Sequence, residues 1–147
     1  MSRLTIDRRH SFSGRDNLDW FFANRKWIRI GPNSIIESAW AKRPLPEVSP
    51  VPRNRGMREA GIRFLLLASK RSHKRAHDRN KIKRWLRAAI AEVHEFSTLE
   101  TQLAARGEQV LVMMRISKPV REVKWDEVVE NVRRIAEHLK KRLARSD

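Results

Sequence analysis

The chain contains no cysteine. This absence excludes a disulfide scaffold, an iron-sulfur cluster, thiol catalysis and thiolate-rich zinc sites. No apolar run approaches the roughly 20 residues that a membrane-spanning helix requires, which excludes an integral membrane protein of that kind. The first residues, Met1 to Gly14, are polar and basic and lack the apolar stretch of a secretory signal. We therefore expect a cytoplasmic protein.

Acidic residues are also scarce: 17 Asp and Glu stand against 33 Lys and Arg, a net charge of +16 in 147 residues. This length predicts a single domain over residues 1–147, and a hydrophobic share of 40% argues against wholesale disorder. A surplus of this size favours a polyanionic partner, because neutralising phosphates releases counterions. An anionic membrane surface is the alternative.

The N-terminal half predicts a brief helix through Leu18 and Phe22, followed by strands over residues 27–30 and 34–41. A turn at Gly31-Pro32-Asn33 separates the two strands. Four of the six prolines then fall within residues 43–56. Because proline cannot donate a backbone hydrogen bond, this stretch is expected to be a loop or extended connector.

The C-terminal half predicts two buried strands, residues 62–68 and 110–116, which are nearly continuous apolar runs typical of central strands covered on both faces. A long helix is expected from about residue 76 to about 96, then a polar connection over residues 98–107. Residues 125–144 carry an apolar stripe at helical spacing. The basic residues at the end of this last helix suit its dipole, which favours helix stabilisation and solubility over RNA contact as their role.

Residues 70–87 read KRSHKRAHDRNKIKRWLR, with nine Lys or Arg, two His and one acid, Asp78. On a helix, the apolar residues that follow Arg79 form one buried stripe, and the opposite arc is almost wholly cationic. A solvated face usually mixes signs, because like charges four residues apart cost a few tenths of a kcal/mol. An anionic ligand would relieve this repulsion, so we expect a nucleic-acid contact. The apolar stripe is needed by the core, which disfavours membrane insertion.

The segment KRAHDRNKIKRWLR resembles the RNR signature of the bacterial ribonuclease P protein subunit, in particular its Bacteroidetes-like branch. In that family, a strand ending in a basic pair leads through a basic turn into a helix reading roughly A-V-x-R-N-R-x-K-R-x-x-R. Lys81 replaces the second arginine of RNR, His77 stands where valine is usual, and Ala88 where glutamate is common. The matching positions are Lys70, Arg71, Ala76, Arg79, Asn80, Lys83, Arg84 and Arg87.

The resemblance implies one α/β (α+β) domain, with a four-stranded sheet, about three packed helices and a left-handed βαβ crossover around the RNR helix. It implies a non-catalytic subunit that binds the catalytic RNA and the 5′ leader of precursor tRNA, while the RNA removes the leader. Leader-binding candidates are Arg8, Arg9 and Phe12. The RNA-binding candidates are Lys70, Arg71, Lys74, Arg75, Arg79, Asn80, Lys81, Lys83, Arg84 and Arg87.

The residues themselves point to no catalytic group, because paired carboxylates, a nucleophile motif and a glycine-rich phosphate loop are all missing. His73 and His77 have a spacing that metal ligands use, but they lie among cations, so we expect both to face RNA or solvent. Mg²⁺ is then expected to be held mainly by the RNA. The expected partners are the catalytic RNA and precursor tRNA, with a monomer in the ribonucleoprotein and no membrane.

Several alternatives stay open at this point. Phe12 either stacks on an unpaired base or packs in the core, and Trp85 either stacks on RNA or covers a neighbouring loop. Trp20, Phe21 and Phe22 are assigned to packing under the first helix. The main functional alternative is a ribosome-associated or other structured-RNA-binding protein without a processing role. A self-sufficient nuclease that uses His73 or His77 is a third hypothesis.

Overall fold

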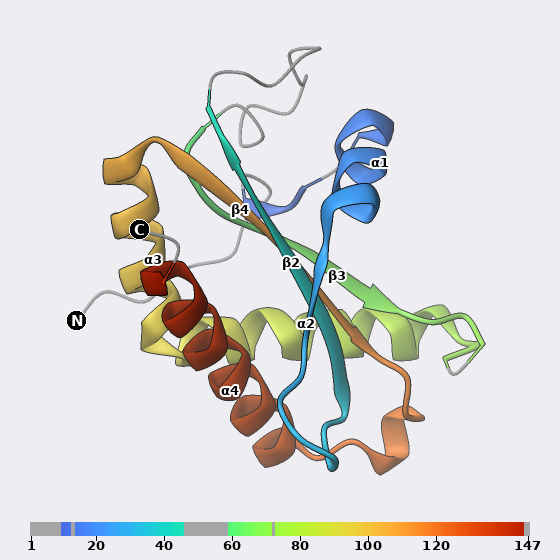
Figure 1. Cartoon of the computed structure of the whole chain (residues 1–147). Coiled ribbons are helices and arrows are strands. Elements are labelled where there is room, and N and C mark those ends of the chain that lie inside the picture. The colour runs from blue at the N-terminus through green and yellow to red at the C-terminus, as the bar shows by residue number, and fades with distance from the viewer. Residues whose placement is uncertain (1–9, 13, 46–58, 72, 146–147) are drawn as a thin grey trace.

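The computed structural model describes residues 10–12, 14–45, 59–71 and 73–145. Within these residues the fold is an α+β domain with one mixed sheet of four strands and four α-helices (Figure 1). The elements in chain order are α1 (Arg15–Asn24), β1 (Lys26–Ile28), β2 (Ile36–Pro44), β3 (Gly61–Ala68), α2 (Ala76–Glu92), α3 (His94–Arg106), β4 (Glu108–Ile116), the 3₁₀ turn η3 (Val120–Glu122) and α4 (Trp125–Arg145).

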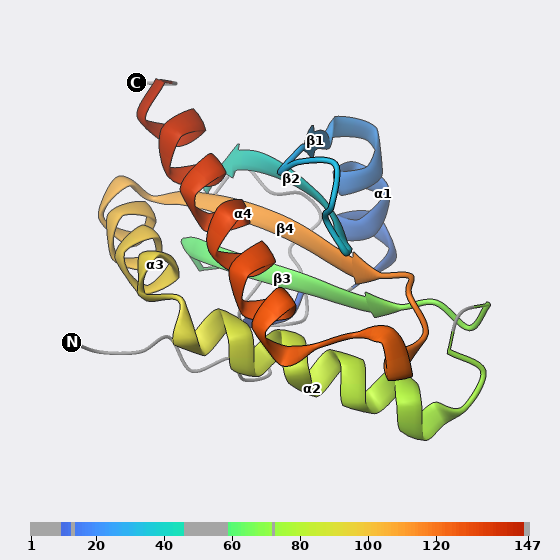
Figure 2. The same ribbon diagram turned by 90° about the horizontal axis from the view of Figure 1, so that it is seen from below.

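The sheet has the strand order β1-β2-β4-β3. β2 pairs antiparallel with both β1 and β4, whereas β3 pairs parallel with β4, from Gly61 opposite Gln109 to Ala68 opposite Ile116. Parallel neighbours need a crossover, which α2 and α3 supply. In Figure 2, seen from the side of α2 and α4, β3 and β4 both point to the right and β4 lies above β3. The crossover is therefore left-handed, against the usual preference, as the resemblance implies.

Alternating side chains of the sheet enter two separate cores. Val110, Val112 and Met114 of β4 pack in the larger core, which also contains the apolar stripes of α2, α3 and α4. Leu111 and Met113 point to the opposite face, where α1 lies. Each fully buried aliphatic side chain contributes about 1.5–3 kcal/mol. The stripes predicted for residues 82–93 and 128–143 are both buried, and they fix the rotation of α2 and α4 about their axes.

The long helix expected from residue 76 to 96 is interrupted, and the expected polar connection is helical. α2 ends at Glu92 because Val93 adopts an extended backbone conformation, and α3 then continues to Arg106. Phe96, Leu99 and Leu103 form a narrow buried stripe in α3 among many polar residues, which explains why the composition suggested a loop. The described chain therefore has four α-helices rather than about three.

Two further expectations about the strands need correction. β3 is an edge strand and not a central one, although the bridge between Ser11 and Phe64 covers part of its outer edge. An apolar run reports that both faces are covered, which is equally true of an edge strand packed between two layers. The expected connector over residues 43–56 also begins later, since Arg43 and Pro44 belong to β2 and pair with Gln109 and Glu108. Its residues 46–56 lie outside the described residues.

Candidate nucleic-acid interface

The cationic face of α2 is positioned by the burial of its opposite side. Ile82 and Leu86 are fully buried against the sheet and α4, so the arc that carries Asn80, Arg84 and Arg87 is exposed. Lys81 and Lys83 lie at its margins and are half-buried. The predicted arrangement of a buried stripe and an exposed basic arc is therefore present on this helix.

The arginines and lysines of this arc lack acidic partners within the described residues. Arg84 and Arg87 take part in no hydrogen bond or ion pair there, and neither does Lys83. The turn before α2 adds four exposed cations, Lys70, Arg71, Lys74 and Arg75. We define these seven cations together with Asn80 and Lys81 as the α2 basic face. Among the described residues no ion pair offsets the repulsion between its charges, which is the electrostatic condition of a polyanion-binding surface.

Arg79 differs from the other arginines of the motif. Its Nη1 donates to the backbone carbonyls of His73 and Lys74, both at 2.9 Å. The side chain therefore folds back over the turn that precedes its own helix. Its guanidinium braces this turn, and the exposed cations of the turn take their positions from it.

His73 is buried and not on the surface, contrary to the expectation for both histidines. The side chain is 1% exposed, and its Nε2 lies 2.6 Å from the carbonyl oxygen of Lys118, which follows β4. The backbone N–H of His73 donates to Ser69 at 2.8 Å. This residue links the turn after β3 to the segment after β4, a contact between distant parts of the sequence that no local pattern signals. His77 is exposed, as expected.

Trp85 covers the contact between α2 and α4. It packs against the larger core, its ring meets that of Trp125 edge-on at 5.8 Å, and the Lys81 ammonium lies 5.0 Å from its centre. Of the two roles left open for Trp85, the structure supports covering a neighbouring segment.

Phe12 is a core residue rather than an exposed ring. It is 2% exposed, packs 5.2 Å from the ring of Phe21, and its backbone N–H donates to Phe64. In this position the ring has no free face for a base, so the packing alternative is the correct one. The other two leader-binding candidates, Arg8 and Arg9, lie outside the described residues.

An exposed aromatic pair that the sequence reading missed lies on the α1 side of the molecule. Phe22 is 43% exposed and Trp27 is 49% exposed, so the packing assigned to Phe22 is wrong. The guanidinium of Arg25 lies 4.9 Å from the Phe22 ring and 4.6 Å from the Trp27 ring. Trp27 also forms a wall of an open pocket of about 670 Å³ beside the β1–β2 turn. We call Phe22, Arg25 and Trp27 the aromatic rim. Its sequence signal was the alternation of β1, which puts Trp27 opposite Ala39 on the α1-facing side of the sheet.

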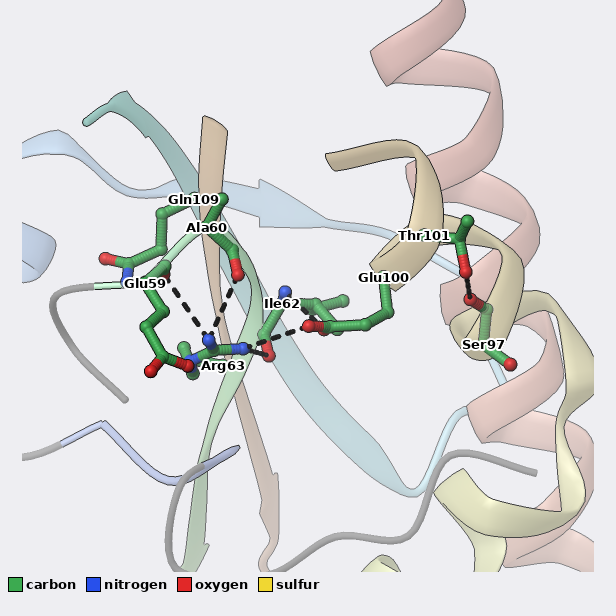
Figure 3. Close-up of polar contacts among 8 residues, drawn as sticks. All are labelled: Glu59, Ala60, Ile62, Arg63, Ser97, Glu100, Thr101 and Gln109. Atoms are coloured by element: carbon green, nitrogen blue, oxygen red, sulfur yellow. Dashed lines mark hydrogen bonds and ion pairs between the residues drawn. The ribbon is translucent and has the colours of Figure 1, made fainter. Parts of the chain in front are cut away.

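Two buried arginines have structural partners and are not part of either surface. Arg63 is 1% exposed and donates to the carbonyls of Ile62 and Ala60 at 2.8 and 3.1 Å and to Glu100 of α3 at 3.3 Å (Figure 3). The other Glu100 oxygen accepts the Ile62 N–H at 2.8 Å. This contact fixes the start of β3 to α3, so Arg63 is a brace of the fold.

The second buried arginine, Arg43, connects α1 with the sheet. It donates to Gln109 at 2.9 Å and to Asn17 at 3.0 Å, and burial lowers the pKa of its guanidinium from the usual value. Gln109 in turn donates to the carbonyl of Glu59 at 2.9 Å. The charge of Arg43 is thus used to position α1 on the sheet.

The described part of the chain offers no group of three or more histidine, aspartate or glutamate side chains arranged to hold a metal ion. None of its helices is long and apolar enough to cross a membrane.

Fold and charge together define an α+β domain with an exposed cationic face on one helix, unpaired among the described residues. Residues 47–140 match the family model of ribonuclease P, and because this is more than half of the chain, the chain belongs to the ribonuclease P family. This confirms the resemblance found in residues 70–87, while the Bacteroidetes-like branch stays a prediction. A search of proteins with curated function gave no match.

Proposed function

We propose that this chain is the protein subunit of ribonuclease P and that it binds the catalytic RNA through the α2 basic face. The observation that carries this proposal is the absence of any acidic partner for Arg84 and Arg87 among the described residues. Membership of the ribonuclease P family supports it independently.

Counterion release sets the expected strength of each contact. Every phosphate that a cation neutralises steepens the dependence of log K on log salt by about 0.9. At about 0.15 M salt, this corresponds to about a fivefold gain in affinity per contact. A few unpaired cations on α2 and its preceding turn are therefore enough for tight binding to a structured RNA.

The single-stranded leader of precursor tRNA is proposed to bind at the aromatic rim rather than at Phe12. The rim offers two exposed rings with an arginine between them, and a base stacked on such a ring gains about 1–3 kcal/mol. β1 and α1 bring these residues together on the sheet face opposite α2. The protein would thus contact the catalytic RNA and the leader through different surfaces.

Catalysis is assigned to the RNA, and the protein contributes binding and orientation. Mg²⁺ is expected to be held mainly by RNA phosphates, because the exposed α2 face is cationic and would repel a metal ion. A cytoplasmic location and a monomer within the ribonucleoprotein belong to the same proposal.

The first experiment measures binding of a bacterial ribonuclease P RNA to the wild type, Arg84→Ala and Arg87→Ala across a range of salt. Each substitution should reduce the salt slope by about one unit. Arg133→Ala is the matched control, because Arg133 is exposed but already paired with Glu130 at 3.1 Å. Unchanged slopes for Arg84→Ala and Arg87→Ala would show that these side chains are merely solvated.

The second experiment compares precursor and mature tRNA as substrates of the reconstituted ribonucleoprotein. Trp27→Ala should weaken binding of the precursor by about 5- to 150-fold and leave mature tRNA unaffected, because mature tRNA lacks the stacked base. Trp125→Ala removes an exposed indole elsewhere and serves as the control. An equal loss on both tRNAs for Trp27→Ala would contradict leader binding at the rim.

The alternative functions make different predictions. A structured-RNA-binding protein without a processing role would not lower the magnesium requirement of the catalytic RNA and would not favour precursor over mature tRNA. A self-sufficient nuclease would cleave precursor tRNA after complete removal of RNA from the protein. Burial of His73 leaves His77 as the exposed histidine of the pair, so His77→Ala tests this last possibility.

A further inference from the structure

The segment that joins β4 to α4, residues 117–124, exposes three cations, Lys118, Arg121 and Lys124, and one acid, Glu122, so its net charge is positive. None of the three has an ion pair with the described residues. The family resemblance assigned no role to this segment. Its charge therefore needs its own explanation.

Helix stabilisation does not explain these cations. Lys124 directly precedes Trp125, the first residue of α4, and the N-terminal end of a helix carries partial positive charge. A cation there is unfavourable by a few tenths of a kcal/mol, whereas Lys140 and Lys141 near the other end are favourable. The dipole therefore accounts for the basic C-terminal residues of α4 but works against Lys124.

The segment lies beside α2. The turn η3 contacts α2, and in Figure 2 the segment before α4 passes beside that helix. The Trp125 ring, immediately after the segment, meets the Trp85 ring. Trp85 stands about 40° from Lys81 around the helix, at the margin of the α2 basic face. The Lys81 ammonium lies over the Trp85 ring. The exposed cations of residues 118–124 thus begin where the α2 basic face ends.

His73 fixes the position of the segment relative to α2. A carbonyl oxygen only accepts hydrogen bonds, so in the 2.6 Å contact the Nε2 of His73 is the donor and Lys118 the acceptor. The carbonyl of His73 in turn accepts from Arg79 of α2 at 2.9 Å. Arg79, His73 and Lys118 form a continuous chain of contacts from the helix to the segment, and its central member is buried.

We propose that residues 118–124 are a second phosphate-binding segment for the RNA bound by α2, and that His73 is the positioning residue that holds the two in register. The ligand chemistry is a phosphodiester backbone that crosses from the α2 basic face onto Lys118, Arg121 and Lys124. The proposal rests on the proposed function, because it requires the α2 basic face to bind RNA.

The test measures the salt dependence of ribonuclease P RNA binding for the triple variant Lys118→Ala, Arg121→Ala, Lys124→Ala. The slope should fall by about two to three units, and affinity at about 0.15 M salt should fall by about 100-fold. The matched control is Lys140→Ala, Lys141→Ala, Arg145→Ala, which removes the same charge from exposed positions near the end of α4. It should change the slope by less than one unit.

If the triple variant loses no more slope than this control, the second segment is refuted. The proposed function has a separate outcome, because it fails only if Arg84→Ala and Arg87→Ala also leave the slope unchanged. Circular dichroism and thermal unfolding check that each protein is folded. Should the triple variant not fold, Arg121→Ala alone is used, with an expected loss of about one unit.

The role of His73 is tested with two substitutions. His73→Gln keeps an N–H donor at a reach similar to that of Nε2, whereas His73→Leu removes it. We expect His73→Leu to lower the salt slope by about one unit. In that protein, adding the triple substitution should lower the slope by less than it does in the wild type. His73→Gln should keep most of the wild-type slope and most of the effect of the triple substitution. If the triple substitution costs the same slope in the His73→Leu protein as in the wild type, His73 has no positioning role.

Discussion

Replacing Gly61 with alanine tests the contact between β3 and α3 with a single methyl group. Gly61 has φ of +123°, a value that residues with a side chain rarely adopt. A Cβ at this position would lie 2.1 Å from Oε1 and 2.6 Å from Cδ of Glu100. Two atoms cannot approach this closely, so the Glu100 carboxylate must leave its site.

The cost follows from the contacts that Glu100 makes. Backbone strain at a positive φ contributes about 1–3 kcal/mol. The carboxylate also gives up the Ile62 N–H and its contact with Arg63, and a hydrogen bond to a charged group contributes about 1.5–3 kcal/mol. Arg63 retains its backbone carbonyl acceptors, which keeps the total towards the lower part of the range. We expect a loss of about 2.5–4 kcal/mol in the free energy of unfolding.

The assay is denaturant unfolding of Gly61→Ala beside Gly107→Ala. Gly107 also has a positive φ, +66°, but a Cβ there would meet no atom within 4 Å. Its substitution should cost about 1 kcal/mol, from backbone strain alone. In a protein that already carries Glu100→Ala, adding Gly61→Ala should lower the free energy of unfolding by less than it does in the wild type. Equal losses for Gly61→Ala and Gly107→Ala would refute the seating of Glu100 against β3.

Three further predictions concern stability. Phe12→Ala should lower the free energy of unfolding by about 3–5 kcal/mol, with equal losses in binding of catalytic RNA and precursor tRNA, because the ring is buried; a selective loss on the precursor would contradict this. Arg79→Ala should cost about 1–3 kcal/mol and lower the melting temperature, because two carbonyls lose their donor, whereas Arg84→Ala should leave it unchanged. Burial lowers the pKa of His138, and the nearby charge of Arg142 lowers it further. The unfolded chain therefore binds more protons than the native protein. Unfolding free energy should therefore fall as pH drops below about 6.5, and His138→Gln should weaken this dependence; an unchanged pH profile would count against it.

The spacing of apolar residues predicted most of the helices and strands, because this spacing depends only on local sequence and on which faces are buried. It predicted the strands after residues 61 and 107 and the stripes of α2 and α4. It could not place β3 at the sheet edge, since edge and central strands give the same pattern when both faces are covered. The break at Val93 was also missed, because this residue is buried and continues the apolar stripe of α2.

The roles of individual site residues were harder to predict, because the sequence does not show which groups each side chain contacts. Arg79 and Arg84 are the same residue type on one helix, and their spacing alone gives both a place on or beside the basic arc. Their roles differ because Arg79 donates to carbonyls of the preceding turn, whereas Arg84 has no hydrogen-bond partner in the part of the chain that the structure describes. Phe12 shows the same limit, since its burial depends on Phe21 and on the backbone of Phe64, which are distant in sequence.

The net charge of +16 therefore overstates the charge available to RNA, because pairing and position together decide which cations contribute. Arg43 and Arg63 are buried against the fold's own acceptors, and Arg133 and Arg134 share Glu130. A cation that shares a carboxylate adds less to the positive potential that attracts a phosphate, because the two charges offset each other. The salt slope of RNA binding should accordingly report the unpaired cations of α2, its preceding turn and residues 118–124, and substitutions of paired arginines should leave it nearly unchanged. Pairing alone does not select them, since Lys140, Lys141 and Arg145 are also unpaired among the described residues; a cation contributes when it is both unpaired and placed beside α2.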